Sequence, residues 1–367
     1  MTQVRDHLFK ELMSWMMTHP DVFPDEAVRH KEATKSAAWT SVCAWPSSAP
    51  SEYVPPARFL IVFFQLDDAP HDVIGQVLDA VRADSKSRGR RGLDPDAEPQ
   101  DGAERADLGR DSAAQGPIHA QSTRIYDLYQ EISTLECPSN ERARERFACS
   151  FGRMCEGMLR EPKDISTIDE KTLFEIRRDS VAVRPFLDAW LLAKGICLPS
   201  DIVIEDTLRR SLDLLITLTT DLVIIANDLG GLEKDRRDLL EAPTKPDLNV
   251  VLAQSNNLEG ALENKEISKG CEDRIKEYED KYEDKIKEFW RQEQELKEKI
   301  AKENIMKGGE KRVLDDYLRL LKNTIDGNIE GHIRLAEIRY PNAEYYLSGL
   351  SRIIKEEGRI GGSKKRG

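Results

Sequence analysis

Two groups of acidic and amide side chains, far apart in the chain, could together bind a divalent metal. They are Asp67, Asp68 and Asp72 in the first group and Asn227, Gly231 and Asp235 in the second. The second group is spaced by four residues, as are Asp68 and Asp72, which on a helix forms one slowly drifting stripe. Carboxylate and amide oxygens suit Mg²⁺, particularly where phosphate oxygens of a substrate complete its coordination. The spacing therefore predicts a magnesium site where two helices face each other across the mouth of a cavity.

Each group adjoins a strongly apolar segment. Residues 57–66 (ARFLIVFFQL) are apolar nearly all round and predict a buried helix, with a buried strand as the alternative because of its β-branched and aromatic content. Residues 208–229 (LRRSLDLLITLTTDLVIIANDL) predict a second long apolar helix that ends at the second group. Clear β-type alternation is nearly absent elsewhere. The sequence therefore predicts an all-α protein whose two core helices each deliver metal ligands at one end.

The two groups resemble the aspartate-rich motif and the Asn/Ser/Glu motif of class I terpene cyclases, the bacterial-type terpene synthases. The resemblance implies three Mg²⁺ ions, with Asp67 as the main ligand, Asp68 beside it and Asp72 at the third acidic position. The second motif departs from the family, because Gly231 stands where Ser or Thr is usual and Asp235 where Glu is usual. A water could replace the missing hydroxyl, since Mg²⁺ retains waters readily.

The resemblance also implies a diphosphate sensor within residues 176–181 (IRRDSV). In the family pattern, Arg177 is the sensor, Ser180 the linker and Val181 the effector, whose carbonyl lies at a helix break near the reactive carbons. Arginine suits the sensor role because its planar fork binds phosphate oxygens in pairs. A register shifted by one residue, with Arg178 as the sensor, is the alternative.

Further residues are assigned by the same resemblance. Lys234, Arg339 and Tyr340 match positions that contact the diphosphate, the last two as an arginine–tyrosine pair near the C-terminus. Aromatic rings at Phe63, Phe64, Trp190 and Tyr340 could line the cavity and stabilise cations through their faces. For each ring, a place in the hydrophobic core is the alternative.

Composition limits the class of protein. The chain has 367 residues, of which 39% are hydrophobic, and a net charge of −12, which argues against general nucleic-acid binding. Its six cysteines show no paired ligand spacing and predict reduced thiols in a cytoplasmic protein. The first residues lack a signal-peptide apolar run, and no apolar stretch reaches the ~18 residues of a membrane helix, so no stable membrane insertion is expected.

The chain organisation predicts one catalytic domain over residues 1–350 with two insertions. Residues 84–121 are rich in Gly, Pro, Arg and Asp with almost no aliphatic side chains, which predicts disorder. Residues 262–312 are densely charged with heptad-like apolar positions, which predicts an extended amphipathic helix, either in a protruding hairpin or at a homodimer contact. Residues 351–367 predict a flexible tail.

The resemblance implies an all-α bundle around a deep apolar cavity and one activity. That activity is the Mg²⁺-dependent cyclisation of a linear isoprenyl diphosphate to a cyclic terpene through ionisation and a carbocation cascade. Because cavity volume sets the substrate's chain length, farnesyl diphosphate is the first expectation and geranylgeranyl diphosphate the second. A prenyl-chain-elongating synthase is an alternative, although Asn227 stands where those enzymes carry aspartate. A catalytically impaired helical binding protein is another alternative, favoured by Gly231.

Overall fold

A computed structural model describes residues 2–46, 48–87, 117–135, 141–162, 168–198, 206–241, 249–253, 269–303, 306, 308–336, 340 and 342–363. Within those ranges the chain forms helices and no strand, so the predicted all-α class is confirmed. The elements in chain order are α1 (Thr2–Met17), α2 (Glu26–Val42), a 3-10 turn (Pro50–Tyr53), α3 (Val54–Asp67), α4 (His71–Ser87), α5 (Pro117–Gln130), a π turn (Glu131–Leu135), α6 (Glu141–Leu159), α7 (Glu170–Ser180), α8 (Val183–Lys194), α10 (Asp206–Glu241), α11 (Val250–Ala253), α13 (Lys269–Glu303), α14 (Gly308–Arg334) and α15 (Ala343–Ser363). No described helix is both long and apolar enough to cross a membrane.

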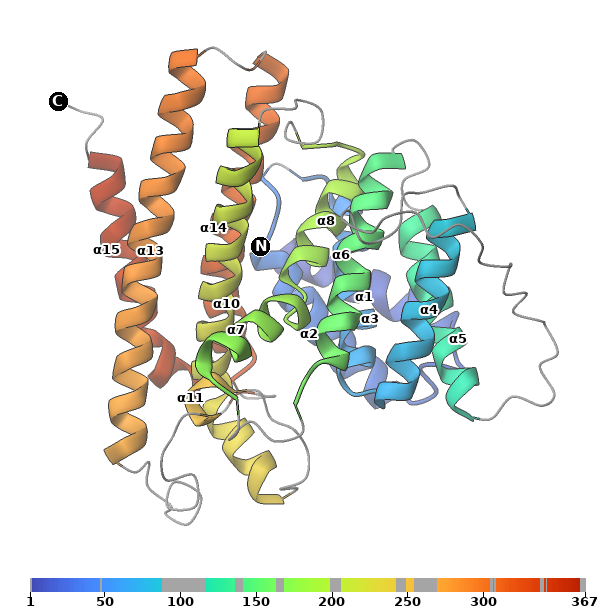
Figure 1. The fold of residues 1–367 in the computed structure, drawn as a ribbon. Helices are drawn as coiled ribbons and strands as arrows, with labels where there is room; N and C mark the ends of the chain where they lie inside the picture. The colour runs from blue at the N-terminus through green and yellow to red at the C-terminus, as the bar shows by residue number, and fades with distance from the viewer. Residues whose placement is uncertain are drawn as a thin grey trace.

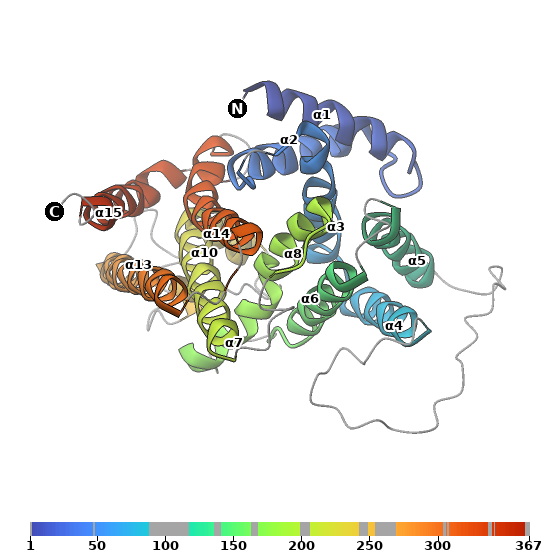
Figure 2. The same ribbon diagram turned by 90° about the horizontal axis from the view of Figure 1, so that it is seen from above.

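The helices form a bundle with an inner and an outer layer. Figure 1 shows the long helices α10, α13 and α14 side by side, and Figure 2 shows most of the bundle nearly end-on. On one side α13 and α15 lie outside α10 and α14, and on the other α4 and α5 lie outside α3 and α6. The inner helices are therefore screened from solvent on both sides, as helices that line a cavity require.

Helix α3 is the first predicted core helix, and its end positions the first acidic group. Two prolines occupy its first turn, where their missing N–H groups would be unpaired in any case. Phe59, Ile61 and Leu66 are fully buried, so the helix prediction is confirmed and the strand alternative is wrong. The helix ends at Asp67, and α4 begins at His71 after Pro70. The expectation that Asp68 and Asp72 share one helix is therefore wrong, because they lie on either side of a turn.

Helix α10 is the second predicted core helix, and it continues through the second group to Glu241. The expectation that it ends at the motif is wrong, since Gly230 and Gly231 both remain helical. Gly230 is required by packing, because a Cβ there would lie 2.9 Å from Cδ2 of His332 on α14. The glycine thus permits the close approach of two helices that both line the cavity.

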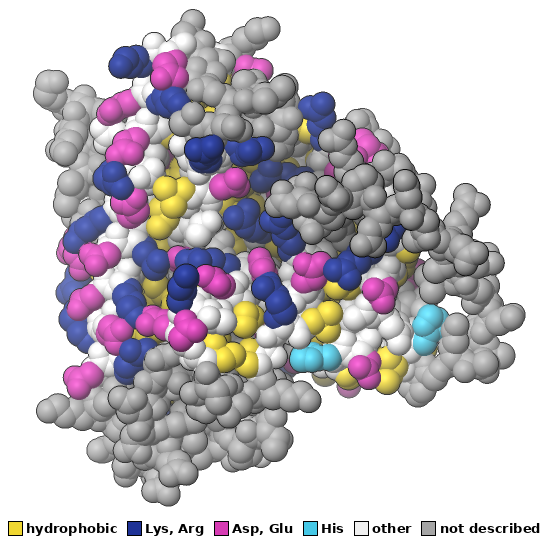
Figure 3. Space-filling model, in the orientation of Figure 1, with side chains coloured by type: hydrophobic (Ala, Val, Ile, Leu, Met, Phe, Trp, Pro, Cys, Tyr) yellow, Lys and Arg dark blue, Asp and Glu magenta, His cyan; other side chains and the backbone are white. Residues whose placement is uncertain are grey.

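Helix α13 is the amphipathic helix predicted within residues 262–312, but it does not protrude. Its apolar side chains Tyr278, Tyr282, Ile286 and Phe289 are buried, and the helix packs against α10 and α15. Full burial of such a side chain contributes about 1.5–3 kcal/mol, so α13 is an integral part of the bundle. Its outer face carries charges of both signs (Figure 3), paired at i, i+4 as in Lys287 with Glu283.

Two other expectations are changed by the structure. Helix α4 extends to Ser87 and α5 begins at Pro117, so both ends of the predicted disordered segment 84–121 are helical, and residues 88–116 lie outside the described ranges. The predicted flexible tail 351–367 is helical as far as Ser363. Its helix starts earlier, and buried Tyr346, Leu347 and Leu350 anchor the first turns on α13 and α14.

The packing of α14 against α2 generates a stability prediction. A Cβ at Gly327 would lie 2.8 Å from the carbonyl carbon and oxygen of Val42 and 2.7 Å from Sγ of Cys43. Because backbone cannot rotate away, Gly327→Ala should lower the free energy of unfolding by about 1–3 kcal/mol. Gly309→Ala on the same helix meets nothing within 4 Å and should leave stability equal or raise it. Thermal unfolding of both variants tests this prediction. Equal melting temperatures for Gly327→Ala and Gly309→Ala would show that residue 327 does not pack closely against Val42 and Cys43.

Candidate active site

A large cavity of about 1130 Å³ lies within the bundle, and α2, α3, α7, α8, α10 and α14 all contribute to its wall. Most of the predicted site residues line it: Phe63, Phe64, Asp67, Asp68, Asp72, Arg177, Ser180, Val181, Asn227, Gly231, Lys234, Asp235 and Tyr340. Arg339 lies outside the described residues. Residues separated by more than 250 positions in the sequence therefore line one cavity.

The acidic residues of the first group lie where the chain turns from α3 to α4. Asp67 is the last residue of α3, Asp68 follows it, and Asp72 is in the first turn of α4. All three are exposed, and α10 contributes Asn227 and Asp235 to the same cavity. Because exposure keeps these carboxylates hydrated, no buried counter-charge is needed to hold them at the end of an apolar helix.

The donor set at this position suits Mg²⁺ only if other oxygens complete the coordination. Among the residues that the structure describes, no three His, Cys, Asp or Glu side chains converge into a ready-made metal site. Asp235 is held by Lys234, 2.7 Å away, and accepts a hydrogen bond from Nδ2 of Asn249 at 2.8 Å. Hard oxygens separated in this way fit Mg²⁺, which binds through one or two carboxylates together with waters and substrate phosphates.

Arg177 is fixed in the cavity wall by a buried ion pair. Its guanidinium donates to Oδ1 of Asp228, whose Oδ2 accepts the backbone N–H of Val250 at 2.8 Å. Burial raises the pKa of Asp228 to about 6, although Arg177 and the Val250 N–H act in the opposite direction. Arg178 instead donates to both oxygens of Asp221, at 2.6 and 2.9 Å, outside the cavity. Of the two registers left open by the sequence, the structure thus places Arg177, not Arg178, in the cavity.

The break between α7 and α8 forms the adjacent wall. Val181 ends α7, donating its N–H to the carbonyl of Arg177 at 2.9 Å, and Ala182 adopts a left-handed φ of 64°. This conformation costs a non-glycine residue about 1–2 kcal/mol. Gly157 of α6 lets α7 approach closely, because a Cβ there would lie 2.7 Å from the backbone N of Ser180. The strained turn therefore places Ser180, Val181 and Ala182 in the cavity wall.

Glu161 is a site residue that the sequence did not indicate. It follows α6, lines the cavity and lies near Arg177, Ser180 and Asp67. Burial raises its pKa to about 7, the Ser180 hydroxyl and the Arg177 charge lower it, and Asp67 raises it. No motif marks Glu161, since only the folded chain brings the end of α6 beside α7.

Asn249 is a second residue that sequence reasoning missed. It is almost fully buried, lines the cavity, and donates from Nδ2 to the Asp228 carbonyl at 2.7 Å as well as to Asp235. Its Oδ1 accepts the N–H of Val251 at 3.0 Å, which holds the start of α11. Asp228, next to Asn227 in the motif, could have been recognised by its position, whereas Asn249 carried no sequence signal.

The predicted cavity aromatics behave differently from one another. Phe63 and Phe64 line the cavity, but the Lys35 ammonium lies 4.1 Å from the centroid of the Phe64 ring. Tyr340 also lines it, with its ring 4.4 Å from that of His332. Trp190 does not line the cavity, which corrects the expectation from the sequence: it is fully buried and packs edge-on against Tyr53 at 5.1 Å.

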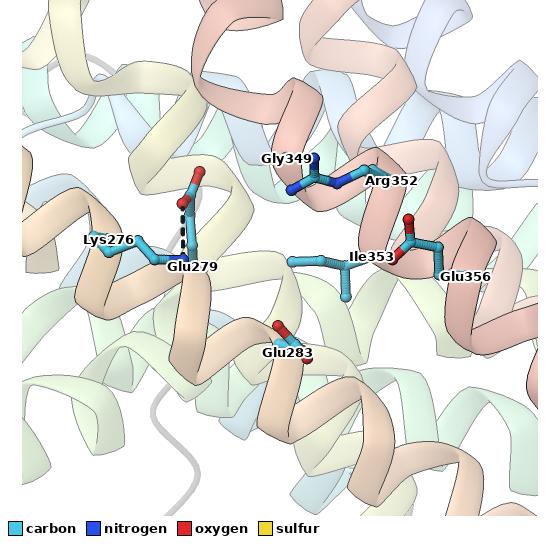
Figure 4. Close-up of a pocket in the computed structure, with 7 residues that line it drawn as sticks. All are labelled: Lys276, Glu279, Glu283, Gly349, Arg352, Ile353 and Glu356. Carbon is cyan, nitrogen blue, oxygen red and sulfur yellow. Dashed lines mark ion pairs between the residues drawn. The ribbon is translucent and has the colours of Figure 1, made fainter.

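Two smaller cavities lie elsewhere. One of about 170 Å³ lies between α13 and α15, where Lys276 and Glu279 pair across 3.8 Å and Arg352 and Glu356 lie on the facing helix (Figure 4). Another, of about 190 Å³, is lined from α6, α8, α10 and α14. Neither approaches the volume of the large cavity, so the large cavity is the candidate active site.

The comparisons with known proteins identify the family and the fold. The model of "Terpene synthase family 2, C-terminal metal binding" matches residues 94–277, half of the chain. None of the curated protein sequences matches it significantly.

Solved structures share the fold. Linalool/nerolidol synthase from Streptomyces clavuligerus, in complex with 2-fluorogeranyl diphosphate, has a TM-score of 0.61 at 17% identity, covering 90% of this chain and 97% of that one. Germacradien-4-ol synthase from Streptomyces citricolor has a TM-score of 0.59 at 14% identity, covering 90% and 94%. Wild-type cucumene synthase has a TM-score of 0.58 at 15% identity, covering 91% and 95%.

The raised pKa values in the cavity predict how stability depends on pH. A carboxyl whose pKa is raised by folding stabilises the folded state below its ordinary pKa, and this contribution is lost as pH rises through the folded value. For Glu161 that window runs from its ordinary 4.5 to about 7. In metal-free protein, Glu161→Gln should therefore flatten the fall in melting temperature between pH 4.5 and about 7. Glu344→Gln, a substitution of an exposed glutamate, is the control. Parallel curves of melting temperature against pH for Glu161→Gln and the wild type would contradict the raised pKa of Glu161.

Proposed function

The chain belongs to terpene synthase family 2 and is a class I terpene synthase, and from this premise we propose that it cyclises a linear isoprenyl diphosphate. The observation that carries the proposal is the convergence of the two acidic groups and Arg177 on one cavity. The proposal further names Mg²⁺ as the metal, three ions as the number implied by the family resemblance, and farnesyl diphosphate as the first substrate to test.

In this proposal the mouth of the cavity holds the diphosphate. Arg177 and Lys234 are cations already positioned in the wall, and Tyr340 with Arg339 would complete the contacts from the C-terminal side. Lys234 is paired with Asp235, so binding of a diphosphate gives that ammonium a second, more highly charged anion to contact. Mg²⁺ held by Asp67, Asp68, Asn227 and Asp235 would neutralise the leaving diphosphate and so assist its departure.

The hydrocarbon chain would lie deeper, against apolar side chains. Leu60, Phe63, Ile74, Val183 and Phe186 line the cavity and exclude water from the carbocation once the mouth is filled by the diphosphate. A volume of about 1130 Å³ lies slightly above the range of about 300–1,000 Å³ for small-molecule sites. It accommodates the hydrocarbon chain of farnesyl diphosphate or that of geranylgeranyl diphosphate.

Phe63 is better suited than Phe64 to stabilise the carbocation. A ring face attracts a cation through its quadrupole, but a fixed ammonium at the same ring repels a second positive charge. Lys35, whose ammonium lies over Phe64, is itself paired with Glu32 at 2.7 Å, which reduces this repulsion without removing it. Of the two phenylalanines, Phe63 on α3 is therefore the ring that we propose to stabilise the carbocation.

The activity can be tested directly. Purified protein is incubated with Mg²⁺ and with diphosphates of ten, fifteen, twenty and twenty-five carbons, and both released diphosphate and organic products are measured. Cyclic products from one chain length support the proposal. Longer linear diphosphates formed in the presence of isopentenyl diphosphate would identify a chain-elongating synthase instead, and no turnover of any substrate would leave a binding protein.

The first acidic group yields a mutational prediction. Asp67→Ala should lower the rate of diphosphate release by about 10²-fold or more, because a main anchor for the metal is lost. Melting temperature should change little, since Asp67 is exposed. Asp79→Ala is the control, because Asp79 is equally exposed on α4 but does not line the cavity. If Asp67→Ala and Asp79→Ala release diphosphate at the same rate, Asp67 does not hold the metal.

Position 231 yields a second mutational prediction. A Cβ at Gly231 would lie 2.9 Å from Oδ2 of Asp235, so any side chain there must displace that carboxylate slightly. Gly231→Ala adds only this crowding, whereas Gly231→Ser adds the crowding and a hydroxyl that can bind Mg²⁺. Gly231→Ser should therefore need less Mg²⁺ than Gly231→Ala for half-maximal rate. Equal Mg²⁺ requirements in the two variants would mean that position 231 does not face the metal.

A further inference from the structure

Helix α14 presents a row of polar side chains to the cavity. Thr324, Asn328 and His332 are spaced by four residues, are all buried, and all line the cavity. Side chains four apart on a helix lie on one face with their Cβ atoms roughly 5–6 Å apart. The proposed binding of diphosphate and metal uses none of them, since those contacts come from α3, α4, α7, α10 and the segment of Arg339 and Tyr340.

Two of these side chains have their donors engaged by backbone carbonyls. The Thr324 hydroxyl donates to the carbonyl of Leu320 at 2.9 Å, so its oxygen can only accept a further hydrogen bond. The Asn328 amide nitrogen donates to the carbonyl of Val223 at 3.2 Å, which fixes the orientation of the amide. Its Oδ1 accepts no hydrogen bond from the described part of the chain. Two acceptor oxygens are thus left beside the cavity.

Acceptor oxygens of buried side chains that face a cavity are best satisfied by a donor within that cavity. A water molecule between two acceptors about one helical turn apart can donate one hydrogen to each, and a polar, roomy site is where such a water is stable. Because this water donates both of its hydrogens to side chains of α14, its lone pairs point away from α14 and into the cavity. This is the orientation in which water attacks a carbocation.

We propose that Thr324 and Asn328 hold a nucleophilic water, so that the product of this enzyme is a terpene alcohol rather than a hydrocarbon. The inference rests on the proposed cyclisation, which supplies the cation. A lone pair of the water forms a C–O bond with the cationic carbon, and one O–H bond of the resulting oxonium breaks. The proton passes to the diphosphate anion released at ionisation, so that the diphosphate ester and water become an alcohol and protonated diphosphate.

The experiment is product analysis after turnover of farnesyl and geranylgeranyl diphosphate in water enriched in ¹⁸O. The expected result for the wild type is an alcohol that carries ¹⁸O as its main product. In Asn328→Leu and Thr324→Val, the alcohol share of total product should fall by about tenfold, as for loss of roughly one hydrogen bond, and hydrocarbons should replace it. The share is independent of the total rate, and Thr324→Val keeps the side-chain shape if Asn328→Leu does not fold.

Thr219→Val is the matched control. Thr219 is a buried threonine whose hydroxyl donates to the carbonyl of Leu215 at 2.9 Å, as Thr324 does to Leu320, but it does not line the cavity. Its variant should keep the wild-type alcohol share.

Four outcomes would overturn the proposal. A wild-type enzyme that releases diphosphate and forms only hydrocarbons, an alcohol without ¹⁸O, or an unchanged alcohol share in both α14 variants each overturns the water site and leaves the cyclisation intact. Absence of any turnover overturns the cyclisation and the water site together.

Discussion

The buried ion pair between Arg177 and Asp228 is the interaction on which the cavity depends. It ties the end of α7 to the middle of α10, and Asp228 in turn receives the N–H of Val250 at the start of α11. Burying two charges costs several kcal/mol, and the pair is maintained only because each partner has further hydrogen bonds or charges around it. The Val250 N–H supplies one of these to the Asp228 carboxylate, and Glu161 supplies a second carboxylate near Arg177. Three segments are thereby held at fixed positions around the point where a diphosphate would bind.

The cavity wall is acidic in one part and apolar in another, and the position of a helix end decides where the acidic part lies. The acidic residues of the first group belong to the exposed turn between α3 and α4, whereas Leu60 and Phe63 of α3 and Val183 and Phe186 of α8 form an apolar part of the wall. The polar row of α14 interrupts this apolar wall. The fold can bury these polar side chains because Thr324 and Asn328 donate hydrogen bonds to backbone carbonyls. Only their acceptor oxygens then remain to be satisfied from the cavity.

The sequence predicted the parts of the site that are carried by local spacing. Asp67, Asp68, Asn227, Asp235 and Arg177 each sit in a short pattern next to an apolar helix, and the fold brings all of them to one cavity. Glu161 and Asn249 were missed because their positions depend on which segments meet in three dimensions. Trp190 was misplaced because periodicity shows that a helical face is buried without showing which neighbour it meets: Phe186 faces the cavity, and Trp190, one turn later, meets Tyr53. The heptad-like pattern of residues 262–312 was equally compatible with a protruding hairpin and with the packed helix α13.

The two departures from the family's second metal motif are one structural feature rather than two. Asp235 is one methylene shorter than the usual glutamate, and its carboxylate lies back along α10, with Oδ2 only 2.9 Å from where a Cβ of residue 231 would stand. A serine at 231 would therefore compete for space with Asp235 in this conformation, and glycine leaves that space to the carboxylate. Lys234 and Asn249 stabilise the same arrangement by contacting the two oxygens of Asp235 separately. Asp235 in this conformation thus requires glycine at position 231, one turn before it. Together the two residues supply a single carboxylate where the family pattern has a hydroxyl and a carboxylate.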